Sequence, residues 1–260
     1  MNPGMSAALD SDTYRATRAA WERIWTEEAD STRELMTVDY PRSRAIRSLY
    51  MPHLAGAKRV VEAGCGLGVE LVGLDRQGIQ AVGIDFALGA LARLYAYRPD
   101  FHLAGGDVHR LPFPRESFDA YLSFGVLEHF EFGPIPALKE ANRVLRPGGL
   151  LVVSVPSPNL IWRWVRARRR SAPSPGPEYF ETAYSVDGLE ASLRGTGFRV
   201  IARHPVGHSF TLWGLGFPFR GPGYYETSDL AERLGGLLLR LTPWAMAFAS
   251  LVIGRKTASA

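Results

Sequence analysis

Cysteine is nearly absent from this chain of 260 residues, with Cys65 as the single example. One thiol forms neither an intramolecular disulfide nor a cysteine-based zinc cluster, so we expect a reducing compartment, the cytoplasm. Long apolar runs are also missing. The longest, Leu241–Gly254, contains Pro243 and is shorter than the ~20 residues that a spanning helix needs. Residues 1–20 carry two aspartates and no apolar run. We therefore expect neither a transmembrane anchor nor a secretory signal.

Lysine is scarce as well, since 27 of the 30 basic residues are arginine. With 26 acidic residues the net charge of the chain is +4. Five of the arginines lie within residues 163–170, and the chain without these five would have a net charge of −1. A nucleic-acid-binding protein needs basic residues spread over a surface, so we expect no nucleic-acid partner. The sequence shows no cluster of acidic and histidine residues with clear ligand spacing, and we expect no metal.

Short β-branched runs alternate with helical patterns in the middle of the chain, which is typical of a parallel sheet covered on both faces. The expected strands are Arg59–Glu62, Ala81–Ile84, Phe101–Ala104, Ala120–Phe124 and Leu150–Val155. The expected helices between them are Val69–Arg76, Ala87–Leu94 and Ile135–Leu145. Arg146–Gly149, with one proline and two glycines, is expected to end the last helix and turn the chain.

The flanking segments follow other patterns. Residues 11–50 have helical spacing and are expected to cap one end of the sheet. Prolines bracket an arginine-rich helix expected at Asn159–Arg170, followed by a helix at Ser185–Leu193 and a sixth strand at Phe198–Arg203. Residues 206–226 show no periodicity from which a helix or a strand can be predicted. Ala245–Ile253 fits a buried helix or a strand, and its apolar, partly β-branched end favours a strand.

The most specific motif is a glycine loop after the first strand, in which Gly64, Gly66 and Gly68 form G-x-G-x-G. Glycines are needed where the chain turns sharply and where a ligand lies against the backbone. A dinucleotide fingerprint has its third glycine where Val69 stands, which argues against a nicotinamide cofactor. The plain alternative is an ordinary tight turn between a strand and a helix.

Two carboxylates follow the loop at the ends of the next strands. Asp85 ends the second strand, where it suits two ribose hydroxyls, and it also suits the N-cap of the following helix. Asp107 follows the third strand, in a position suited to hydrogen bonding with an adenine amino group.

Together with these residues, several further motifs resemble those of class I S-adenosylmethionine-dependent methyltransferases. They are Glu62, Gly106-Asp107-Val108, Leu111–Asp119, Leu127-Glu128-His129 and Arg143–Gly149, in order over residues 58–156. The resemblance implies an α/β, Rossmann-like, doubly wound sheet of seven strands in the order 3-2-1-4-5-7-6. Its last strand is antiparallel, helices cover both faces, and insertions follow toward the C-terminus. One domain, 1–260, then comprises a cap (11–50), a cofactor-binding core (58–156) and substrate-side insertions (157–184 and 206–243).

The resemblance also implies the site residues. The loop would hold the methionine part of S-adenosylmethionine, Asp85 its ribose, Asp107 and Val108 its adenine, while Phe124 and Gly125 line the cofactor near the methyl group. The full set expected to bind the cofactor is Glu62, Gly64, Cys65, Gly66, Gly68, Asp85, Phe86, Gly106, Asp107, Val108, Phe124 and Gly125. Cys65 lies inside the loop, so a structural or cofactor-lining role is expected rather than that of a nucleophile.

Methyl transfer from a sulfonium is an in-line displacement, in which positioning and water exclusion supply most of the catalysis. His129 is the candidate general base, because it follows the fourth strand at the edge where ligands bind and titrates near neutrality. A packing role for His129 is the alternative. The expected activity is methyl transfer to a small-molecule or lipid-linked acceptor, at oxygen. This assignment of the acceptor atom rests on a loose resemblance of Leu127–His129 to quinone and natural-product O-methyltransferases.

Other functions and partners stay open at this point. Ser123-Phe124-Gly125-Val126 stands where base N-methylating enzymes carry Asn/Asp-Pro-Pro-aromatic, which disfavours nucleobase methylation. A non-catalytic cofactor-binding or scaffold protein is one alternative, and a nicotinamide-dependent oxidoreductase is a weaker one. The helix at Asn159–Arg170 is either a solvated lid or a contact with an anionic or lipid-linked substrate or a membrane surface. Phe210–Tyr225 is either an acceptor pocket or core.

Overall fold

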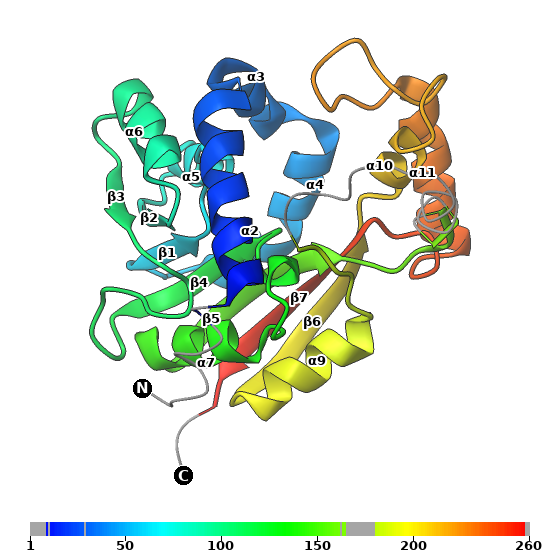
Figure 1. Cartoon of the computed structure of the whole chain (residues 1–260). Helices are drawn as coiled ribbons and strands as arrows, with labels where there is room; N and C mark the ends of the chain where they lie inside the picture. Colours follow the sequence, from blue (N-terminus) through cyan, green and yellow to red (C-terminus); the bar gives the residue numbers. More distant parts are fainter. Residues whose placement is uncertain (1–8, 10, 29, 162, 165–179, 258–260) are drawn as a thin grey trace.

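A seven-stranded β-sheet runs through the centre of the molecule, with helices on both of its faces (Figure 1). The computed structural model describes residues 9, 11–28, 30–161, 163–164 and 180–257. The strands are β1 Val60–Ala63, β2 Ala81–Asp85, β3 His102–Gly105, β4 Phe118–Phe124, β5 Leu145–Pro156, β6 Phe198–Val206 and β7 Ala249–Lys256. Their order is β3-β2-β1-β4-β5-β7-β6, and β7 is antiparallel to both of its neighbours. The predicted order and the reversed last strand are confirmed.

The helices form three groups along the chain. Those between the strands are α5 Val69–Asp75, α6 Leu88–Tyr97, η4 Leu127–His129, α7 Ile135–Val144 and α9 Val186–Gly195. The N-terminal group is α2 Asp12–Arg23, η1 Ile24–Glu28, α3 Ser31–Met36, η2 Thr37–Asp39, α4 Pro41–Tyr50 and η3 Met51–Leu54. The C-terminal insertion contains α10 His208–Trp213 and α11 Asp229–Leu241.

Alternate residues of the central strands point to opposite faces of the sheet, and each face is buried under its own helices. Val152 of β5 packs in one cluster with Leu74 of α5, while Val153 packs in the other with residues of α7 and α9. Because both faces are covered, the strands are continuous apolar runs rather than alternating ones. This explains why the predicted strand positions agree closely with the structure.

The entry to β5 differs from the prediction. The helix ends at Val144 and the strand begins at Leu145, so Arg146–Gly149 belongs to the strand and does not form a separate turn. Leu145 pairs with Phe118 of β4, and the register between the two strands then shifts. Leu150 next pairs with Ala120, so Arg146–Gly149 form an irregularity of the strand opposite Asp119, where proline and glycine are tolerated.

The C-terminal third also differs from the prediction. Helix α11 was not expected, although Ser228 caps it by accepting a hydrogen bond from the Ala231 N–H (3.2 Å). The final strand was expected at Ala245–Ile253, and it is a strand that begins at Ala249 instead. The expected arginine-rich helix, Asn159–Arg170, lies largely outside the described residues.

The N-terminal helices lie over the carboxyl ends of the strands, with α2 crossing in front of the sheet in Figure 1. Thr17 of α2 accepts a hydrogen bond from the Phe180 N–H (3.2 Å), and Trp25 lies against Gly66 after β1. In the part of the chain that the structure describes, no helix combines the length and the hydrophobicity that a membrane span requires.

Candidate functional site

The loop Gly64–Gly68 joins β1 to α5 at the carboxyl edge of the sheet. Its three glycines have φ angles of +80°, +50° and +77°, a left-handed region that residues with a side chain rarely adopt. Space requires glycine too, since a Cβ on Gly64 would lie 2.3 Å from Cγ2 of Val126. The glycines thus let the loop pack tightly against neighbouring side chains. Gly64–Leu67 line a cavity at the edge where open α/β sheets bind ligands.

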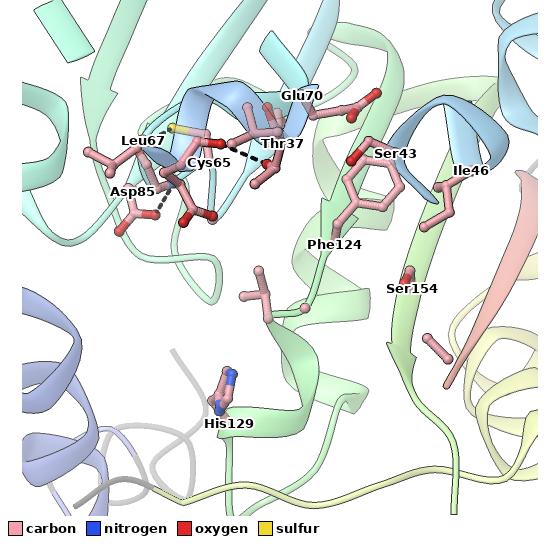
Figure 2. A pocket seen from close by; sticks show the side chains of 18 of the residues that line it. Thr37, Ser43, Ile46, Cys65, Leu67, Glu70, Asp85, Phe124, His129 and Ser154 are labelled. Atoms are coloured by element: carbon pink, nitrogen blue, oxygen red, sulfur yellow. Dashed lines mark hydrogen bonds between the residues drawn. The ribbon is translucent and has the colours of Figure 1, made fainter. Parts of the chain in front are cut away.

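Asp85, at the end of β2, braces this loop (Figure 2). Its Oδ2 accepts a hydrogen bond from the Gly66 N–H (2.8 Å) and its Oδ1 accepts one from the Ala87 N–H (2.8 Å). Burial raises the pKa of the Asp85 carboxyl, and these backbone bonds oppose the rise. A carboxylate oxygen accepts two hydrogen bonds, so each oxygen retains capacity for a hydroxyl of a ligand.

A cavity of about 330 Å³ opens beside the loop. Figure 2 shows Cys65 and Asp85 on one side of it, Ser43 and Ile46 on the other, and Phe124 between them. The predicted site residues that line it are Glu62, Gly64, Cys65, Gly66, Asp85, Phe86, Phe124, Gly125 and His129. Gly68, Gly106, Asp107 and Val108 are not part of this lining.

The segment Gly106–Val108 lies next to the cavity. The Gly106 N–H donates to the carbonyl of Asp85 (3.0 Å). The Asp107 carboxylate accepts hydrogen bonds from the Tyr14 hydroxyl and from Nδ1 of His109 (2.7 Å). Burial alone would raise the pKa of Asp107, but the bonds from His109 and Tyr14 outweigh burial and lower the pKa to about 2. This carboxylate is therefore ionised and engaged by neighbouring side chains.

Glu62 presents an unsatisfied group to the cavity. Its carboxyl is buried, and among the described residues its Oε2 has no hydrogen-bond partner. Burial raises the pKa of Glu62 well above its usual value, and the negative charges of Glu70 and Asp85 raise it further. Glu70 itself is paired with Arg47 at 2.8 Å. A buried oxygen without a partner on a cavity wall is suited to a donor supplied by a ligand.

The Cys65 thiol is buried beside the loop and packs with Leu71 and Leu94. Burial raises its pKa well above the usual value, and the charges of Asp85 and Glu62 add to the rise. The thiol therefore stays protonated near neutral pH, which is unfavourable for a nucleophile.

His129 lies at the end of η4 and faces the cavity (Figure 2). Its Nδ1 lies 3.0 Å from the carbonyl oxygen of Phe180, and since a carbonyl only accepts, Nδ1 carries the proton. Nε2 is then the nitrogen that accepts a proton. Burial lowers the pKa of His129 to about 4, although the Phe180 bond opposes this effect. The imidazole is accordingly neutral at physiological pH.

Glu128 lies behind His129, with Oε1 4.0 Å from Nε2 of the imidazole. Its side chain is buried, and its Oε2 has no partner among the described residues. Burial raises the pKa of Glu128 to about 8, so the carboxyl is largely protonated at neutral pH. Glu128 and His129 therefore form an uncharged pair.

The half of the cavity away from the glycine loop is mainly apolar. It is lined by Ile46, Phe124, Val206, Phe248 and Ala249, from α4, β4, β6 and the start of β7. One cation reaches it: Arg42 lines the cavity, and its guanidinium lies 3.9 Å from the ring centre of Phe210. The guanidinium is buried, which lowers its pKa, and the negative charges of Glu34 and Glu232 oppose this effect.

Sequence reasoning missed the residues that close the cavity from the N-terminal side. They are Thr17, Trp21, Trp25, Glu34, Thr37, Arg42, Ser43 and Ile46. Trp21 and Trp25 are stacked with ring centres 5.6 Å apart, and Trp21 meets His129 edge-on at 4.8 Å. The helical spacing of these tryptophans indicated a buried face, but no local pattern shows which part of the sheet that face covers. Among the described residues, no group of three His, Cys, Asp or Glu side chains is placed to hold a metal.

Residues 61–153 match a protein family described as a methyltransferase domain. The match runs from β1 to within β5 and so includes the glycine loop, Asp85 and the Leu127–His129 turn.

Curated relatives match a similar share of the chain. A demethylmenaquinone methyltransferase of Beutenbergia cavernae is 39% identical over 99 residues, which are 37% of this chain and 40% of that protein. One of Mycobacterium marinum is 33% identical over 150 residues, 56% of this chain and 62% of the relative. A probable S-adenosylmethionine-dependent methyltransferase of Mycolicibacterium smegmatis is 32% identical over 107 residues, 41% of each protein. The chain thus spans about two fifths of the length of the first of these relatives.

Solved structures match nearly the whole chain at low identity. The 1,6-didemethyltoxoflavin-N1-methyltransferase of Burkholderia thailandensis, bound to 1,6-didemethyltoxoflavin and S-adenosylhomocysteine, has a TM-score of 0.61 and 16% identity. The alignment covers 99% of this chain and 92% of that one. A SAM-dependent methyltransferase of Thermotoga maritima has a TM-score of 0.60 and 18% identity, covering 92% and 99%. At such identities the likeness shows a shared fold.

Proposed function

The chain carries a methyltransferase domain of the class I S-adenosylmethionine-dependent family, and we propose that it transfers a methyl group to a small-molecule or lipid-linked acceptor. The observation that carries this proposal is one continuous cavity with two unlike halves. The glycine loop and Asp85 line one half, and apolar side chains around Phe124 line the other. A transferase needs this arrangement, because donor and acceptor must meet with water excluded.

The residues present fit S-adenosylmethionine, the cofactor of the family. The part of the loop that lines the cavity, Gly64–Leu67, and the partnerless Oε2 of Glu62 suit the methionine part with its amino group. Asp85 would accept from the ribose hydroxyls, and Gly106–Val108, hydrogen bonded to Asp85, remains our proposed adenine site. When bound, the cofactor supplies an electrophilic methyl group, and Phe124 and Gly125 would lie beside it.

We assign His129 the role of general base for a hydroxyl acceptor. Its Nδ1 is held by the Phe180 carbonyl, which fixes the ring and makes Nε2 the proton acceptor. Its pKa of about 4 keeps the ring neutral and able to accept a proton over the physiological range, although it also makes the base a weak one. Positioning of the acceptor therefore contributes more than proton removal.

An aromatic or quinone-like ring with an oxygen substituent is the acceptor that the apolar half suits best. Ile46, Phe124 and Phe248 offer apolar surfaces for a ring, and Arg42 offers a cation for a partly negative oxygen. Relatives named as demethylmenaquinone methyltransferases point to the same class. We propose oxygen as the methylated atom, since His129 is the proton acceptor on this wall.

Calorimetric titration with S-adenosylhomocysteine and with NADH tests the cofactor assignment. We expect heat of binding with S-adenosylhomocysteine and none with NADH. Asp85→Asn should weaken binding about tenfold or more, because it exchanges one acceptor oxygen for a donor. Asp187→Asn, on the exposed surface of α9, is the matched control and should bind normally. Binding of NADH alone would overturn the proposal.

Transfer of a labelled methyl group separates an enzyme from a cofactor-binding scaffold. The acceptors to be offered are quinols, phenols and carboxylic acids, each with and without a prenyl tail. We expect label in the organic extract from a ring hydroxyl. Bound cofactor without label in any of these acceptors would favour the scaffold alternative.

A further inference from the structure

Helix α11 exposes a stripe of four leucines. Leu230, Leu234, Leu237 and Leu241 are 43%, 37%, 48% and 69% exposed. Their spacing of four, three and four residues places them on one face of the helix, along about 16 Å of its length. An apolar stripe of this spacing normally faces a protein core.

The same helix packs on the protein through small residues instead. Ala231 and Gly235, one position after Leu230 and Leu234, are buried. A Cβ on Gly235 would lie 2.6 Å from the backbone nitrogen of Ser209, so α11 sits directly against α10. The leucine face is therefore exposed, and the face with small residues is buried in its place. An exposed apolar face of this kind indicates an interaction site.

Basic residues accompany the stripe. Arg233 and Arg240 are exposed and follow Leu230 and Leu237 by three residues, which places both on the same flank. Asp229 is the only exposed acidic residue of α11 and lies at its first turn. The long arginine side chains can lie beside an apolar surface and still reach anionic groups.

A second exposed segment adjoins the end of α11. The Leu160 N–H donates to the carbonyl of Ala245 (3.2 Å), and Nδ2 of Asn159 donates to that of Ala247 (3.0 Å). Leu160 and Trp164 are 58% and 49% exposed, and Arg163 between them is exposed as well. The segment repeats the combination of apolar and basic side chains found on α11.

We propose that α11, together with Leu160, Arg163 and Trp164, forms a contact surface for an anionic lipid bilayer, with the leucines inserted at the headgroup boundary and the arginines bound to lipid phosphates. A helix lying in the interface combines these features. A second copy of the chain fits less well, because symmetric pairing through the stripe brings the flanking arginines of both copies together. Figure 1 shows α10 and α11 together at one side of the molecule.

This surface lies close to the cavity. Gly207, which caps α10, lines the cavity, and so does Phe248, whose ring centre is 4.8 Å from that of Phe210 in α10. The insertion thus forms a cavity wall on one side and the proposed bilayer contact on the other. The contact stands without the proposed methyl transfer, and only its purpose, access to a lipid-linked acceptor, rests on that function.

Vesicle co-sedimentation of the full chain tests the surface. We compare vesicles of phosphatidylcholine with vesicles of phosphatidylcholine and phosphatidylglycerol at low and high salt. We expect binding to the anionic vesicles that salt weakens. Leu234→Gln/Leu237→Gln should reduce the partition coefficient by at least ~10-fold, since two exposed apolar contacts are lost. Arg233→Gln/Arg240→Gln should remove most of the preference for the anionic lipid.

Leu239→Gln is the matched control, because Leu239 is 46% exposed on the same helix but lies off the stripe. It should bind vesicles as the wild type does. Wild-type protein that stays in the supernatant, or a stripe variant that sediments like the control, overturns the proposal. So does a wild-type dimer that the stripe variant converts to monomer. Calorimetry with S-adenosylhomocysteine confirms that each variant is folded, and it reports on the cofactor site independently of the bilayer contact.

Discussion

The adjacent residues Glu128 and His129 behave as an uncharged pair although both are ionisable. Burial acts on them in opposite directions, since it raises the pKa of the acid to about 8 and lowers that of the imidazole to about 4. With 4.0 Å between Oε1 and Nε2, an ion pair was the simple expectation. At neutral pH the neutral imidazole of His129 on the cavity wall instead lies beside a neutral acid, which matches a site that accepts a proton from a hydroxyl.

Glu128→Gln tests the state of the acid. The carboxyl ionises near 4.5 when unfolded and at about 8 when folded. Its contribution to stability is complete below pH 4.5 and falls as pH rises toward 8, by up to about 1.4 kcal/mol per pH unit. The glutamine variant lacks this loss, so urea unfolding should show its stability relative to wild type rising between pH 5 and 8. A difference that is constant with pH contradicts the assignment.

His129→Asn tests the base. The asparagine amide can donate to the Phe180 carbonyl as Nδ1 does, but it has no counterpart of Nε2. We expect kcat to fall about 100-fold with unchanged affinity for S-adenosylhomocysteine. The wild-type rate should not decline through protonation of His129 until the pH approaches 4. Full turnover in the variant would assign His129 a packing role.

At the scale of elements, the loop between β1 and α5 requires glycine for two reasons. Its backbone adopts positive φ angles, and neighbouring side chains leave no space for a Cβ. The prediction of this loop from sequence succeeded because three glycines at fixed spacing specify a backbone that other residues cannot adopt. Asp85 was predictable for a similar reason, since the end of β2 must lie beside the loop in a parallel sheet.

Gly64→Ala and Gly78→Ala separate the two requirements. Both glycines have φ near +80°, but a Cβ on Gly78 meets nothing within 4 Å, whereas one on Gly64 meets Val126. Gly78→Ala should lower the free energy of unfolding by about 1–2 kcal/mol and leave S-adenosylhomocysteine binding intact. Gly64→Ala should cost at least ~1 kcal/mol more and abolish binding. Equal losses of stability with intact binding in both variants would show that the loop is not a ligand site.

Other elements escaped prediction for physical reasons. Arg146–Gly149 has the composition of a turn, yet it lies within β5, between two residues that pair with β4. Helix α11 has a capping serine and leucines at helical spacing, but it packs on the protein through Ala231 and Gly235. The positions of its leucines therefore do not show which face is buried. Local signals fail where the decisive contact is made by a distant segment.

At the scale of the whole molecule, the cavity is assembled from three regions far apart in the sequence. The loop, Asp85 and Phe124 come from the core that the sequence indicated, whereas Trp21 and Arg42 come from the N-terminal helices and Gly207 from the C-terminal insertion. The half of the cavity beside the glycine loop was therefore predictable from motifs. The apolar half was not, because its residues meet only through packing of the cap and the insertion on the sheet.

Charge is also distributed by region. The net charge of +4 depends on the arginines at 163–170. Of these, Arg163 is exposed beside the chain that follows α11, whereas the half of the cavity beside the glycine loop holds the buried carboxyls of Glu62 and Asp85. The net charge of the chain therefore carries no information about the reaction.

A crystal structure of the complex with S-adenosylhomocysteine tests the central claim most directly. We expect the homocysteine part against Gly64–Gly68 and the ribose hydroxyls on Asp85. The sulfur should face the apolar half of the cavity beside Phe124 and Gly125, with Nε2 of His129 on the wall of that space. A ligand bound outside this cavity, or a sulfur directed away from the apolar half, would contradict the account.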